Sequence, residues 1–88
     1  MKAIITVVGK DKTGIVAGVS TKIAELGLNI DDISQTVLDD FFTMMAVVSS
    51  EEKKDFTALR QDLETFGDSL NTKINIQSAA IFDAMHNI

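Results

Sequence analysis

The chain has 88 residues, of which 45% are hydrophobic and 24% charged, and its formal net charge is −5. This size accommodates one hydrophobic core, so we expect a single domain spanning residues 1–88. The acidic balance disfavours binding to nucleic acid or to a membrane surface, and the absence of cysteine excludes disulfides, thiolate nucleophiles and Cys-based metal sites.

No apolar run approaches the ~20 residues of a membrane span. The N-terminal apolar segment is also too short for a signal peptide. We therefore expect a cytoplasmic protein.

The first half of the chain predicts a strand, a helix and a second strand. Residues 3–8 are β-branched or small and are followed by Gly9, as in a strand buried on both faces. Residues 14–26 carry apolar side chains at helical spacing, and Gly27 follows at the position typical of a helix C-terminal glycine. Residues 29–38 predict a strand of mixed facial character.

The second half predicts a strand, a helix and a last strand. Residues 41–48 are β-rich and follow a turn at Asp39-Asp40 that lacks the favoured glycine. Ser49 and Glu52 have the spacing of a capping box, which predicts the start of a helix whose apolar positions run to Leu70. Alternation in residues 74–77 indicates a short strand with one solvated face.

The element order is therefore βαββαβ. With right-handed crossovers, this order gives a ferredoxin-like α+β fold: a four-stranded antiparallel sheet of strand order 4-1-3-2, with both helices on one face. The pattern offers an internal check, because the two strands that this topology makes central, 3–8 and 41–48, are the two that are apolar on both faces. The two edge strands are more polar, as edges should be.

Such a sheet leaves one face without helices. On this open face the strand 41–48 presents Phe41, Met45 and Val47, and a bare apolar patch on a small protein usually marks an interface. The tail 79–88 predicts a short helix with apolar residues on one side, formed by Ile81, Phe82, Met85 and Ile88. We expect the open face to be covered by this tail, by a partner subunit, or by a tail exchanged between subunits.

The segment between the first strand and the first helix is the main candidate for function. It would bring the backbone N–H groups of a helix N-terminus to one end of the sheet, beside Lys10 and Lys12, and such a place suits a carboxylate. Asp11 or Thr13 can cap the helix, so the segment also has a purely structural interpretation. Gly14 allows a close approach of a ligand or a neighbouring backbone.

A second group of polar residues opens the strand 29–38. Asn29 offers an amide that donates and accepts, and we place it across the same end of the sheet from the loop. Asp31 or Asp32 could accept an ammonium group. An anion cradle facing a carboxamide and a carboxylate complements a zwitterion, so the sequence favours a free amino acid as ligand.

Several segments resemble the ACT domain, an amino-acid-sensing regulatory module, and more closely the small free-standing ACT proteins of bacteria. These segments are Lys10–Val16, Leu28–Ile30 with Asp32-Ile33, and the tail 81–86. The resemblance implies oligomers formed through sheets or helices, with ligands held at subunit interfaces. It implies contacts at the loop and at the start of the second strand. The candidate ligand-binding residues are Asp11, Lys12, Thr13, Gly14, Ile15, Asn29 and Ile30. The chain departs from the commonest pattern by having Lys-Thr, not Arg-Pro, before the glycine.

Other function classes fit the sequence poorly. An acylphosphatase-like enzyme needs an arginine after the first strand, but the arginine of this chain is Arg60. The Asp pairs lack the spacing of a calcium loop, and the lone His86 cannot form a zinc site. We expect no catalytic residue, metal or cofactor. We expect a homo-oligomer, in the simplest case a dimer, that senses an amino acid or similar small carboxylate and modulates a separate enzyme or regulator. The alternative is an adaptor module with no small-molecule ligand.

Overall fold

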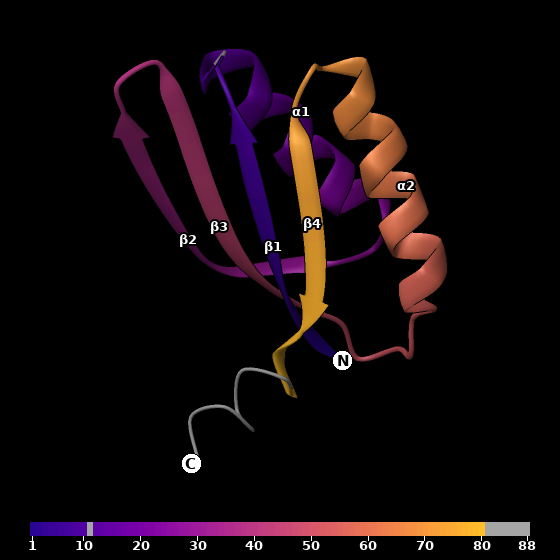
Figure 1. Ribbon diagram of the computed structural model, residues 1–88. Helices are drawn as coiled ribbons and strands as arrows, with labels where there is room; N and C mark the ends of the chain where they lie inside the picture. Colours follow the sequence, from indigo (N-terminus) through magenta and orange to yellow (C-terminus); the bar gives the residue numbers. More distant parts are fainter. Residues whose placement is uncertain (11, 81–88) are drawn as a thin grey trace.

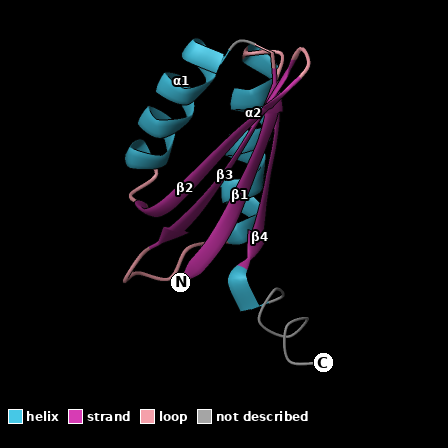
Figure 2. Ribbon diagram, turned by 90° about the vertical axis from the view of Figure 1, so that its left-hand side faces the viewer, coloured by secondary structure: helices cyan, strands magenta, loops and turns pink. Residues whose placement is uncertain are grey.

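The computed structural model describes residues 1–10 and 12–80 as a sheet backed by two helices (Figures 1 and 2). The elements are β1 (Lys2–Gly9), α1 (Lys12–Glu25), β2 (Asn29–Leu38), β3 (Phe41–Ser49), α2 (Phe56–Ser69) and β4 (Lys73–Ser78). The strand order is β2-β3-β1-β4, and every neighbouring pair is antiparallel. The predicted fold and strand order are confirmed.

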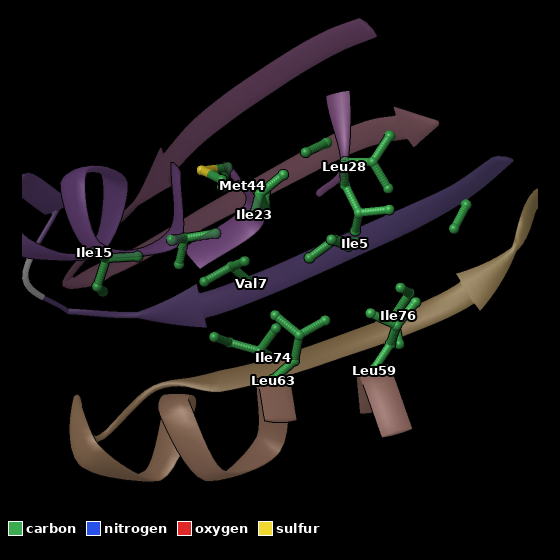
Figure 3. Close-up of a cluster of buried hydrophobic side chains, with 14 of the residues drawn as sticks. Ile5, Val7, Ile15, Ile23, Leu28, Met44, Leu59, Leu63, Ile74 and Ile76 are labelled. Carbon is green, nitrogen blue, oxygen red and sulfur yellow. The ribbon is translucent and has the colours of Figure 1, made fainter. Parts of the chain in front are cut away.

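The core forms between the helices and one face of the sheet, because alternate strand residues point to that face. Figure 3 shows side chains from both helices meeting those of the strands. The buried sheet residues are Ala3, Ile5, Val7, Phe42, Met44, Ala46, Val48, Ile74 and Ile76. The helices contribute Ile15, Val19, Ile23, Leu59 and Leu63, and Leu28 follows α1. Within the described residues only one face of the sheet has this cover, and we call the other the open face.

The α1 C-terminus has the predicted glycine cap. Gly27 has φ +75°, a conformation that is strained for residues with a Cβ. Its N–H donates to the Ala24 carbonyl at 3.0 Å, and the N–H of Leu28 donates to the Ile23 carbonyl at 3.2 Å, which completes a Schellman motif. This cap stops the helix and returns the chain into β2.

The predicted start of the second helix is wrong. Ser49 belongs to β3, where it pairs with Lys2 of β1, and Glu52 lies before the helix. The N-cap of α2 is Asp55, whose side chain accepts a hydrogen bond from the N–H of Thr57 at 2.9 Å. The helix therefore begins at Phe56, after a connection that follows the end of β3.

The tail helix expected over residues 79–88 lies mostly outside the described residues. Ala79 and Ala80 are already helical, and the N–H of Ala80 donates to Ser78 Oγ at 3.3 Å. In the described part of the chain, neither helix has the length and apolar character needed to cross a bilayer.

Candidate functional site

The loop between β1 and α1 lies at the end of the sheet where β1 stops, in the upper part of Figure 1. Gly9 pairs with Phe42 there, and the strand becomes α1 at Lys12. A Cβ on Gly9 would collide with Ile15 Cδ1 and lie 2.9 Å from Thr72 Oγ1. The glycine therefore lets the first turn of α1 and the α2–β4 turn approach the end of β1 closely.

The first turn of α1 separates the predicted site residues into two kinds. Thr13 and Gly14 are exposed, so a ligand can reach them, whereas the Ile15 side chain is only 2% exposed and belongs to the core. Ile15 can contribute to a site only through its backbone. Asp11 lies outside the described residues, and Lys12 is placed as the first residue of α1. Among the described residues, no acidic side chain lies in the first turn of α1.

Lys10 connects this loop to the β2–β3 hairpin. Its ammonium nitrogen lies 5.6 Å from the ring centroid of Phe41, within the range of a cation–π contact. Lys10 and the Phe41 ring are both exposed, so the contact is solvated and weak. It places the positive charge of Lys10 over the β2–β3 hairpin, two residues before α1 begins.

Asn29 and Ile30 lie at the opposite end of the sheet. Asn29 pairs with Ser49, the last residue of β3, whereas the loop adjoins Phe42 near its start. Ser49 lies seven residues after Phe42 in β3, roughly 23 Å along the sheet. The expectation that Asn29 lies across the same sheet end as the loop is wrong within one chain, because α1 runs the length of the sheet before β2 begins (Figure 1).

The start of β2 gathers a second polar group. Asn29 is exposed and is followed by two carboxylates. Asp31 Oδ1 accepts a hydrogen bond from Ser49 Oγ at 3.0 Å, and Asp32 Oδ1 accepts one from the N–H of Ile33 at 2.9 Å. A register shift between Ile30 and Asp32 in the pairing with β3 marks this segment as irregular. Negative and amide groups thus cluster at one end of the sheet, and the α1 N-terminus lies at the other.

The edge strand β2 also exposes apolar side chains that the sequence analysis did not single out. Ile30, Ile33 and Val37 pair with core-facing residues of β3 and so point to the helix side of the sheet, yet Val37 is 60% exposed. The helices do not cover this strand, all of whose residues are exposed. The sequence could have predicted this apolar strip, since Ile33 and Val37 are spaced so that they share one face of β2.

The described residues contain no cluster of three or more His, Cys, Asp or Glu side chains able to hold a metal ion. A hollow of about 650 Å³ lies beside the α2–β4 turn and is lined mainly by polar groups. A smaller one of about 190 Å³ lies on the open face beside Ile4, Met45 and Val47. None of the described candidate residues of the loop, nor Asn29 or Ile30, lines either hollow, whereas Asp32, which was expected to accept an ammonium group, lines the smaller one.

Comparison with known proteins identifies relatives along the whole chain. A family model described as an ACT domain matches residues 2–77. A UPF0237 protein from Streptococcus pneumoniae is 82% identical over 88 residues, and one from Listeria monocytogenes is 49% identical over 89 residues; each match covers 100% of both chains.

Solved structures show the same fold. An ACT domain protein from Streptococcus pneumoniae has 83% sequence identity and a TM-score of 0.89, with 93% of each chain covered. A formyltetrahydrofolate deformylase from Burkholderia mallei has a TM-score of 0.76 at 18% identity, and the match covers 90% of this chain and 28% of that one. At such low identity the second likeness concerns the fold alone.

Proposed function

The chain belongs to the ACT domain family of regulatory domains, and on that premise we propose that it senses a free amino acid or similar small carboxylate at a site shared by two copies of the chain. The observation that carries this proposal is the separation of the two polar groups. The α1 N-terminus and Asn29 lie at opposite ends of one sheet, so one ligand cannot contact both within a chain. A second copy is needed to complete the site.

The exposed edge strand supplies a way to bring the two groups together. If β2 pairs antiparallel with β2 of a second copy across a two-fold axis, the start of each strand lies beside the end of the other. The end of β2, at Leu38, is the end of the sheet where the β1–α1 loop lies (Figure 1). Thr13 and Gly14 of one copy would then face Asn29 of the other, twice per dimer.

The apolar side chains exposed along β2 favour pairing of this strand with β2 of a second copy. Ile30, Ile33 and Val37 present apolar side chains to solvent on the helix side of an unpaired edge. Long exposed edges with apolar side chains tend to pair with another chain, and burial stabilises such pairing by about 25 cal/mol per Å² of apolar surface. A dimer formed through β2 would both pair the strand edge and bury its apolar side chains.

The two halves of such a site complement a zwitterion. The α1 N-terminus with Lys10 attracts a carboxylate, whereas Asp31 and Asp32 beside Asn29 of the second copy attract an ammonium group. A ligand that bridges both halves binds the paired form and not the separated chains. It therefore stabilises the dimer, and a partner enzyme or regulator that contacts the dimer would sense the ligand.

A thermal-denaturation screen tests the proposal. Because the chain has no Trp or Tyr, unfolding is followed by far-ultraviolet circular dichroism in the presence of free amino acids, purines and folate-like acids. A ligand at 100 times its Kd adds about 2.7 kcal/mol, which raises Tm by roughly 10–20 °C in a domain of this size. If no compound shifts Tm and a protein partner co-purifies instead, the chain is an adaptor.

Once a ligand is found, a mixing experiment tests whether the site is shared. Gly14→Leu and Asn29→Ala should each abolish the Tm shift, whereas Asn75→Ala, which removes an exposed amide from β4, should leave it unchanged. When the two defective variants are mixed and re-equilibrated, half of the dimers are mixed and each has one intact site. Binding should then return to about a quarter of the wild-type capacity. A site within one chain would give no recovery.

A further inference from the structure

The open face of the sheet has an apolar centre, with Asp32 and Lys10 at its margin. Phe41 is 51% and Met45 43% exposed there, and Val8 is exposed as well. Ile4 and Val47 are half-buried and line the hollow of about 190 Å³ next to Met45. An exposed apolar patch of this kind on a small domain is typical of an interface.

The end of β4 shows how the chain continues toward the tail. Ser78 pairs with Ala3 at the end of the sheet where β1 begins. Its hydroxyl accepts the N–H of Ala80, as an N-cap side chain does, and Ala79 and Ala80 are already helical. A helix therefore starts directly after the strand, with no connecting loop.

This connection determines which sheet the tail can reach. A helix that packs back on its own sheet normally follows a connection of 2–6 residues that reverses the chain. Here the first helical residues continue past the end of β4, away from the sheet (Figure 2). A straight helix begun in this direction does not lie on the sheet from which it starts, but it is free to lie on another copy.

We propose that residues 79–88 form a helix that docks on the open face of a second copy, with the two copies exchanging their tails. The sequence places Ile81, Met85 and Ile88 on one side of such a helix, with Phe82 adjacent. Ten helical residues span about 15 Å, close to the roughly 13 Å between Ile4 and Val8 along β1. The length and the apolar side of the tail thus match the apolar centre of the face.

This contact is separate from the proposed pairing of β2 edges, because the tail leaves the sheet beside β4 and β1, whereas β2 is the opposite edge. The two contacts use different surfaces and can be lost independently. The inference therefore does not depend on the proposed ligand site.

Cross-linking between engineered cysteines distinguishes the possible occupants, since the chain has no native cysteine. Val47→Cys on the open face is mixed with Met85→Cys in the tail, and a short bismaleimide is added. Tail exchange predicts cross-linked heterodimers in the mixture and none with either variant alone. A link that forms only within single chains of the double variant would show that each tail covers its own sheet and would overturn the proposal.

Two further cross-linking results would also overturn it. Efficient linking of Val47→Cys to itself would mean that two open faces pack against each other. The absence of any link would mean that the tail does not dock on this face.

Solution mass gives an independent measurement. Removal of residues 81–88 and Met45→Lys should each halve the mass measured by sedimentation equilibrium, because only the β2 contact then joins the copies, while circular dichroism shows that the sheet and helices persist. Met85→Lys should do the same, but Asp83→Lys, on the opposite side of the tail helix, should leave the mass unchanged. An unaltered mass in the truncated chain would contradict the exchange of tails.

Discussion

Gly67 and Thr72 are in contact across the C-terminal turn of α2. The N–H of Thr72 donates to the Gly67 carbonyl at 2.8 Å, and a Cβ placed on Gly67 would lie 2.5 Å from the Thr72 carbonyl oxygen. Thr72 is buried, and its hydroxyl lies beside Gly9 at the end of β1. The close contact between Gly67 and the α2–β4 turn therefore positions Thr72 beside the end of β1, where the β1–α1 loop lies.

Gly67→Ala should lower the free energy of unfolding by about 1–3 kcal/mol, because the added methyl group meets backbone that must shift. Gly18→Ala is the matched control, since both residues lie within helices and gain about 1 kcal/mol of helix propensity. At Gly18 the Cβ would meet Phe66 Cζ at 3.2 Å, on a half-buried and movable side chain. Urea denaturation should give Gly67→Ala a clearly lower free energy of unfolding than Gly18→Ala. Equal free energies of unfolding would contradict this account.

Asn71 ends α2 in the left-handed conformation, with φ +52°. Its N–H donates to the Asp68 carbonyl at 3.2 Å, so Asn71 has the role in α2 that Gly27 has in α1. Asn71→Ala should lower the free energy of unfolding by about 1 kcal/mol, since a Cβ without a local polar partner is strained there. Asn71→Gly should stay within about 0.5 kcal/mol of the wild type. Urea denaturation checks both variants. An unchanged free energy of unfolding in Asn71→Ala would show that the turn adjusts its backbone to the substitution.

The exposed side chain of Val37 allows a direct test of pairing through β2. Val37→Lys should halve the solution mass, because it places a charge on the apolar strip of this edge, and lysine is a common device against edge pairing. Gln61→Lys, exposed on α2 and outside both proposed contacts, is the control and should have no effect. If Val37→Lys keeps both its mass and its ligand-induced Tm shift, the shared site is not formed through β2.

The sequence predicts the topology well because each strand's alternation reports which face is covered. Residues 3–8 and 41–48 are apolar on both faces and are central in the sheet, as predicted. The exposed Phe41 and Met45 likewise agree with a sheet whose second face is not covered by α1 or α2. The periodicity of apolar residues indicates the buried faces because a residue that packs in the core has to be apolar.

The position of Asn29 relative to the β1–α1 loop was predicted wrongly, because it depends on distances along the sheet that no local sequence pattern records. Asn29 follows α1 closely in sequence, but the fourteen residues of α1 move the chain about 21 Å along the sheet. Whether Asn29 meets the loop thus depends on a second copy. The capping pattern failed for a related reason: Ser49 extends β3 beside Lys2, and this pairing outweighs a local preference for capping.

The position of the α2 cap gives a last prediction. Asp55→Ala should cost about 1 kcal/mol of unfolding free energy, because the N–H of Thr57 loses the carboxylate that accepts it at 2.9 Å. Asp55→Asn should retain most of the stability, since an amide oxygen also caps. Glu52→Ala should change the stability by less than about 0.5 kcal/mol, because Glu52 lies outside the helix and its side chain, which is 82% exposed, forms a solvated ion pair with Lys54 at 3.6 Å. A larger loss from Glu52→Ala than from Asp55→Ala would mean that the helix starts at Ser49 in solution, as the sequence pattern predicts.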